Sequence, residues 1–72
     1  MSEHRLQSLH AAFDRALARV ESARRELRAA KSQAPRDEDE RRTIERLESE
    51  VRECERDAAH VELQIIQAME SA

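Results

Sequence analysis

An all-α fold, an antiparallel hairpin of two long helices, is predicted by three observations on this 72-residue sequence. The sequence has no Gly, one Pro and one aromatic residue, so it lacks the turn and strand residues that a sheet requires. Apolar residues recur every seven positions in two segments, as in paired helices. The two repeats are out of phase because Ala34 and Ile44 are ten residues apart. One unbroken helix would therefore turn its apolar stripe away from its neighbour, and we expect a fold-back.

The first helix is predicted over about residues 3–33. Its apolar side chains occupy two positions of the heptad, called a and d. These are Leu6, Phe13, Val20, Leu27 and Ala34 at a, and Leu9, Ala16, Ala23 and Ala30 at d. Pro35 disfavours a helical conformation in the residue before it, so we expect this helix to end near Gln33.

The second helix is predicted over about residues 37–70, after a turn at about 34–37. Asp37 is a candidate N-cap with Glu40 three residues later, and acidic residues in a first turn suit the positive end of the helix dipole. Its seam residues are Ile44, Val51, Ala58 and Ile65 at a, and Leu47, Cys54, Val61 and Ala68 at d. The whole chain, residues 1–72, is predicted to be one hairpin domain.

The register of the two helices follows from the positions of these residues. In an antiparallel pair, an a residue shares a layer with a d residue, and the two residue numbers add to a constant. A sum of 74 pairs Val20 with Cys54 and places the midpoint at residue 37, inside the predicted break. With this sum we expect Arg24 to face Glu48, Arg19 to face Asp57 and His10 to face Glu62, with Glu26 opposite Glu50 as an unfavourable pair.

Further apolar residues predict a binding surface at the end of the hairpin away from the turn. A two-helix hairpin of this size buries only a narrow seam, and a chain this short draws little stability from one core. Ala12, Leu17, Ala59, Leu63, Ile66 and Met69 add apolar surface beyond the seam. We expect homodimerisation into a four-helix bundle, binding of a partner protein, or both, unless the C-terminal segment frays instead. The predicted interface residues are Leu6, Leu9, Phe13, Leu17, Leu63, Ile66 and Met69.

Catalysis, cofactors and metals are not expected from the reactive residues of this sequence. Cys54 falls at a seam position, where an inert thiol is expected, although an intermolecular disulfide about a two-fold axis stays possible. The three His residues lack the spacing of a metal site, and the many carboxylates lie on solvated helix faces. The sequence has no apolar run of membrane-spanning length, and a single Cys suits a reducing compartment, so a cytoplasmic location is expected.

The functional prediction is a non-enzymatic protein-binding module, such as a small adaptor, inhibitor or co-chaperone. Two alternatives stay open: an Arg-rich dimer that binds RNA, and a purely structural homo-oligomer. Nucleic-acid binding is disfavoured by the net charge of −3 and by the lack of exposed aromatic residues for base stacking.

The layout is similar in size and helix pattern to several short hairpin families. These are the small co-chaperones of bacterial type III secretion, the plasmid RNA-binding hairpin dimer that controls copy number, and small phage inhibitors of host regulators. No shared motif carries this resemblance, so it assigns no role to any residue. The basic residues are twelve Arg and one Lys, which is typical of a GC-rich bacterial or phage genome.

Overall fold

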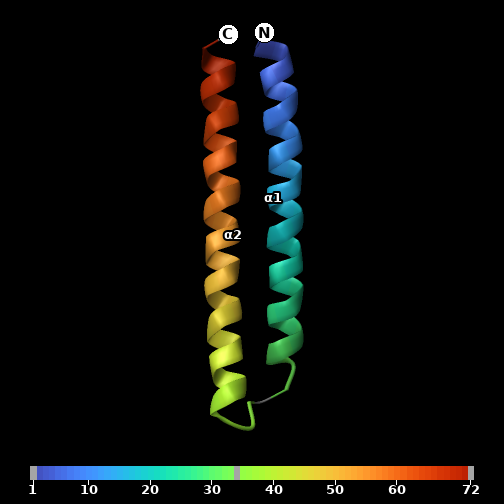
Figure 1. The fold of residues 1–72 in the computed structure, drawn as a ribbon, viewed down its shortest axis with the longest axis vertical. Coiled ribbons are helices and arrows are strands. Elements are labelled where there is room, and N and C mark those ends of the chain that lie inside the picture. Colours follow the sequence, from blue (N-terminus) through green and yellow to red (C-terminus); the bar gives the residue numbers. More distant parts are fainter. Residues whose placement is uncertain (1, 34, 72) are drawn as a thin grey trace.

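The computed structural model describes residues 2–33 and 35–71 and shows two helices packed side by side as a hairpin (Figure 1). Helix α1 spans Ser2–Lys31 and helix α2 spans Glu38–Glu70. The Cα atoms extend over 54 × 14 × 12 Å, so the hairpin is a rod. The beginning of α1 and the end of α2 lie at one tip and the turn lies at the other (Figure 1). The predicted all-α hairpin is confirmed.

Helix α1 ends two residues before the expected position near Gln33. Ser32 explains the difference, because its backbone amide donates to the Ala29 carbonyl oxygen at 3.4 Å and its hydroxyl donates to the same oxygen at 2.7 Å. Bonding to a carbonyl three residues earlier tightens the last turn and stops the α-helical ladder. Pro35 by itself predicts a later end of this helix than the structure shows. Ala34, which was predicted as the last seam residue of this helix, lies outside the described residues.

Helix α2 begins with the cap that the sequence predicts. Asp37 has an extended backbone, and its carboxylate accepts a hydrogen bond of 2.9 Å from the Glu40 amide. The Glu40 carboxylate in turn accepts a 2.6 Å bond from the Arg36 amide, which lies one residue before the amide that usually donates in a capping box. Acidic residues fill the first turn of the helix, where its dipole is positive. These bonds fix the point at which the chain leaves the turn.

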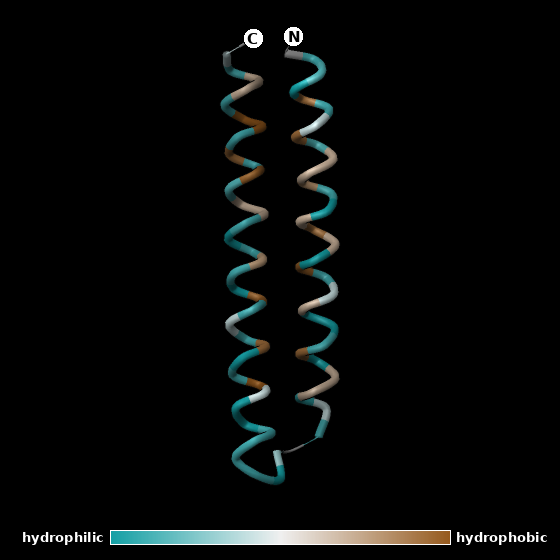
Figure 2. Tube along the Cα trace, in the orientation of Figure 1, coloured by the Kyte–Doolittle hydropathy of each residue, from teal (hydrophilic) through white to brown (hydrophobic). Residues whose placement is uncertain are grey.

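The seam between the helices contains the core. Hydrophobic residues recur along the facing sides of both helices (Figure 2). The buried hydrophobic residues all occupy predicted a or d positions: Ala16, Val20, Ala23, Leu47, Ala58 and Ile65. The residues given as buried on α1 are Ala16, Val20 and Ala23, whose small or branched side chains permit close approach of the two backbones.

One cluster supports the predicted register. Ala16, Val20 and Ala58 form a buried group, with Phe13 and Cys54 packed against it. The sum of 74 places Ala16 with Ala58 and Val20 with Cys54, so two predicted layers meet in this cluster. Arg19 and Asp57, which the register places opposite each other, line the same surface hollow, in agreement with that register. Cys54 is half-buried and free.

The ion pairs across the opposite flank differ from the prediction. Arg24 bonds to Glu55 instead of Glu48, and Lys31 lies 3.3 Å from the Glu48 carboxylate. The predicted partner of Arg24 was therefore wrong, although the layers agree. Side chains on a helix lean toward its N-terminus. In this antiparallel pair Arg24 and Glu55 lean toward one another, whereas Arg24 and Glu48 lean apart. The predicted contact of His10 with Glu62 has the same unfavourable geometry, and no ion pair joins them among the described residues.

Candidate functional site: the open end

The open end of the hairpin is the half formed by residues 2–17 of α1, residues 57–70 of α2 and the C-cap Ser71. It lies at the tip away from the turn, where α1 begins and α2 ends (Figure 1). The seven predicted interface residues all belong to this half. The structure divides them into two groups according to their exposure.

The first group lies in the seam. Leu6, Leu9 and Phe13 are half-buried, because each faces α2 along the heptad pattern while its outer edge stays in contact with solvent. Ile65, which shares the predicted layer of Leu9, is buried. These residues hold the two helices together at the open end and offer only their edges to another molecule.

The second group is exposed. Leu17 is 42% exposed, Ile66 44%, Leu63 51% and Met69 60%, and these four are the large hydrophobic residues that the structure leaves exposed among the residues it describes. All four lie in the open end. Because isolated exposed apolar residues are common on proteins, their grouping in one half is more informative than their exposure.

Three of the exposed residues lie on successive turns of α2. Leu63, Ile66 and Met69 are spaced three residues apart, so consecutive members are neighbours on the helix surface. Each three-residue step rotates the position by about 60° around the helix axis. The row therefore winds from the back of α2 at Leu63 to the flank of the hairpin at Met69. We call these three residues the α2 apolar row.

Leu17 lies on the same flank of the hairpin as Met69. It precedes Arg24 by seven residues, or about two helical turns, and Met69 follows Glu55 by fourteen. Since Arg24 and Glu55 are bonded to one another, their flank is shared. In the register of 74, Leu17 is level with Asp57, about 18 Å along the axis from the level of Met69. A helix laid along this flank would span that distance in between three and four turns.

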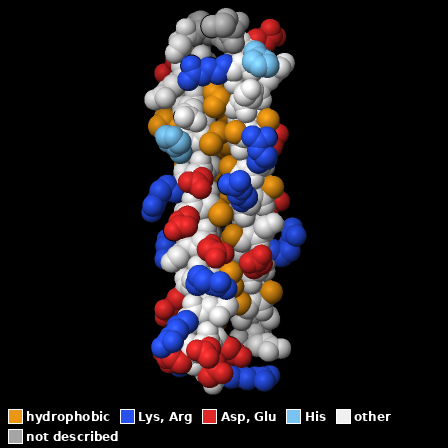
Figure 3. Space-filling view, viewed as in Figure 1, with side chains coloured by type: hydrophobic (Ala, Val, Ile, Leu, Met, Phe, Trp, Pro, Cys, Tyr) orange, Lys and Arg blue, Asp and Glu red, His pale blue; other side chains and the backbone are white. Residues whose placement is uncertain are grey.

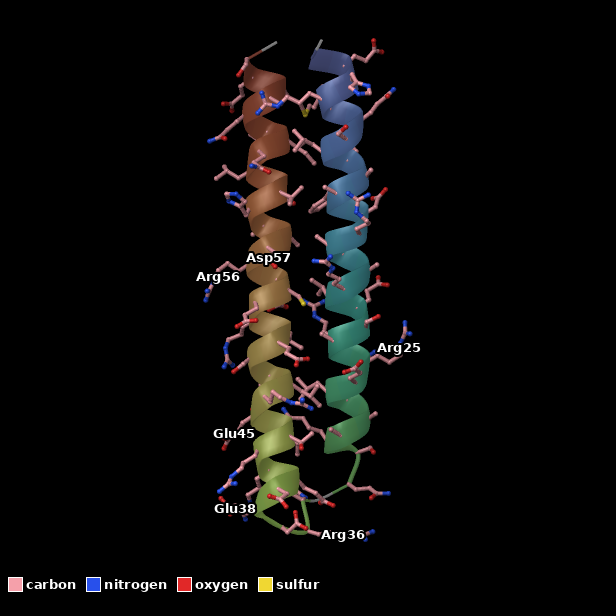
Figure 4. The ribbon with its side chains drawn as sticks, viewed as in Figure 1. Arg25, Arg36, Glu38, Glu45, Arg56 and Asp57 are labelled. Atoms are coloured by element: carbon pink, nitrogen blue, oxygen red, sulfur yellow. The ribbon has the colours of Figure 1, made fainter. Side chains whose placement is uncertain are left out.

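The other flank and the turn half are polar. On the opposite flank Arg19 and Asp57 line one shallow hollow, and Glu26 and Glu50 line another. Charged side chains crowd the turn end of the visible face (Figure 3). Arg25, Glu45 and Arg56 point away from the seam into solvent (Figure 4). The apolar surface is therefore restricted to one end and mainly to one flank.

The described residues include no group of three or more His, Cys, Asp or Glu side chains that could hold a metal ion. None of the helices that the structure describes is both long enough and apolar enough to span a membrane. No family model, curated protein or solved structure matches this chain.

Proposed function

We propose that this chain is a non-enzymatic protein-binding module whose open end self-associates, binds a partner protein, or does both in one four-helix assembly. A small adaptor, inhibitor or co-chaperone is the class of role that this implies, in the cytoplasm, where a free Cys is stable. One observation carries the proposal: the four exposed large hydrophobic residues all lie in the half away from the turn.

The energetics of the hairpin support this proposal. A single seam between two helices leaves Leu6, Leu9 and Phe13 only half-buried. Additional apolar area removed from water contributes about 25 cal/mol per Å², so a second molecule on the open end would stabilise both the contact and the fold. Helical hairpins commonly satisfy this need by packing helix against helix in a bundle or by holding an amphipathic helix in a groove.

The ion pairs favour a protein as the ligand over nucleic acid. Arg24 and Lys31 are engaged by Glu55 and Glu48, so part of the positive charge of α1 is neutralised within the hairpin. A nucleic-acid site needs basic side chains that are free to displace counterions from phosphates.

A substitution in the α2 apolar row tests the proposal. Ile66→Glu places a charge at the centre of the row without altering the seam, and it should lower self-association at least about tenfold, because a charge in a desolvated apolar contact is unfavourable. The mass in solution would be measured by sedimentation equilibrium over a range of concentrations. Ser49→Glu is the matched control, since it adds the same charge to an exposed position of α2 in the turn half.

The control should behave as the unsubstituted chain does. A mass and partner-binding profile that Ile66→Glu leaves unchanged would show that the open end is not the contact surface. Helix content measured by circular dichroism distinguishes loss of binding from loss of folding.

A further inference from the structure

The net charge of the chain is concentrated in one segment of the open end. Residues 1–17 carry two basic and two acidic side chains, residues 18–56 carry eleven of each, and residues 57–72 carry three acidic and no basic ones. The net charge of −3 is therefore the charge of the last segment, which also contains the α2 apolar row. The turn half is crowded with charge but balanced.

The acidic side chains lie next to the exposed apolar ones. Glu62 precedes Ile66 by four residues and Glu70 follows it by four, so both are its neighbours on the helix surface, and both are exposed. The last turn of α2 has no basic residue, and the C-terminal end of a helix is itself negative. The α2 apolar row thus lies in a negative local field.

Leu17 has the same surroundings. Asp14 precedes it by three residues and Glu21 follows it by four, and both carboxylates are exposed. Glu21 also shares a surface hollow with Arg24 and Arg25, of which Arg24 is bonded to Glu55, whereas Asp14 has no Lys or Arg three or four residues away on α1. The two exposed apolar sites on this flank are therefore both bordered by acidic residues.

From this pattern we infer that the open end binds an amphipathic helix of another protein in which Lys or Arg residues border the apolar face. This inference rests on the proposed function and adds the chemistry of the partner. Burial of Leu17, Ile66 and Met69 against the apolar face supplies the attraction, and the bordering carboxylates select basic helices and speed their association.

A second copy of the chain matches this surface less well. When two copies pack through the same flank, each brings the carboxylates that border its apolar residues to the contact, and like charges near each other oppose association. Self-association and partner binding should therefore respond to salt in opposite directions. Salt screens the repulsion between two copies, whereas it weakens attraction to a basic helix.

The test uses two designed helical peptides as probes with the full-length chain. Both have Leu at every third or fourth position on one face; one has Lys and Arg beside that face and its twin has Glu at the same positions. Binding would be measured by fluorescence anisotropy of the labelled peptides at about 50 mM and 300 mM salt. The basic peptide should bind at least about tenfold more tightly than its twin at the lower concentration, and the difference should shrink at the higher one.

A pair of charge variants identifies the responsible residues. Glu62→Gln together with Glu70→Gln should remove most of the preference for the basic peptide. Glu45→Gln together with Glu53→Gln changes the net charge equally on exposed positions of the same helix in the turn half, and it should leave the preference intact. Equal loss in both pairs would mean that only net charge matters, and it would overturn the assignment to the open end.

Three other outcomes would overturn the inference. Equal binding of both peptides would remove the charge selection but keep an apolar binding site. Binding of neither peptide by a chain that sediments as a dimer would make a second copy the occupant of the surface. Binding of neither peptide by a chain that sediments as a monomer would defeat the proposed function as well.

Discussion

Arg24 of α1 bonds to Glu55 of α2. In the register of 74, Arg24 is level with position 50, so its partner lies five residues further along α2. Lys31 and Glu48 repeat the same relationship one heptad nearer the turn. Both pairs are exposed, and exposed pairs contribute at most about 1 kcal/mol each. The apolar layers, and not these ion pairs, therefore set the register of the hairpin, which leads to the first prediction.

A cysteine placed at position 20 should form a disulfide with Cys54 within one chain. Val20 and Cys54 pack in the same cluster, and residues in one layer of closely packed helices fall within the range of Cα separations that a disulfide spans. Val20→Cys should give a monomeric oxidised species with no free thiol, detected by mass spectrometry and non-reducing electrophoresis. Leu27→Cys is the control, since position 27 would meet Cys54 only if the helices were shifted by one heptad. The register would be refuted if the intramolecular disulfide formed faster in Leu27→Cys than in Val20→Cys.

Leu47→Ala should be among the most destabilising single changes in α2. Leu47 is buried, and removing a buried Leu side chain costs about 2–5 kcal/mol. Since a chain this small has only a few kcal/mol of core stability, the variant should be largely unfolded at 37 °C. Urea unfolding followed by circular dichroism measures the difference. Leu63→Ala removes the same atoms from an exposed position and should cost under about 1 kcal/mol; equal losses would contradict the assigned faces of α2.

Asp37→Ala should cost about 1 kcal/mol because it removes the acceptor for the Glu40 amide. Asp39→Ala removes a carboxylate from the same turn without removing a capping hydrogen bond. It should therefore lower the free energy of unfolding by less than Asp37→Ala does. The free energies of unfolding of the two variants, measured side by side at low salt, isolate the cap from the dipole. A loss as large in Asp39→Ala as in Asp37→Ala would assign the whole effect to charge.

Ala16→Leu should destabilise the hairpin by about 1–3 kcal/mol, because Ala16 is buried in the seam and three more carbon atoms would overpack it. Ala11→Leu introduces the same side chain at an exposed position of α1 and should leave the midpoint of thermal unfolding nearly unchanged. A stabilised Ala16 variant would indicate a cavity at the seam in place of close packing.

The heptad pattern predicted the seam because burial against a single neighbouring helix requires a residue on that face at every turn or so. Ala58 and Leu47 are buried at predicted positions for this reason. The pattern could not predict the partner of Arg24, because heptad positions give the level of a residue and not the direction in which a long side chain leans. It also missed the earlier end of α1, which depends on a local hydrogen bond from Ser32.

The sequence predicted which apolar residues lie outside the seam at the open end, and their role as a binding site stays a prediction. Counting apolar residues beyond the heptad placed Leu17, Ile66 and Met69 at the open end, and the structure leaves all three exposed there. The separation of Leu6, Leu9 and Phe13 as seam residues follows from their a and d positions. The occupant of the surface is a property of two molecules, and the sequence of one chain constrains it only through the charges that border the apolar residues.

The most direct test of the account is a residue-by-residue map of the binding surface by amide NMR spectroscopy. Spectra would be recorded across a dilution series of the chain alone and during titration with the basic helical peptide. The account predicts that the amides of Leu17, Leu63, Ile66 and Met69 and their neighbours shift, whereas those around Arg25 and Glu45 do not. Shifts concentrated in the turn half, or no shift in either experiment at millimolar concentrations, would contradict it.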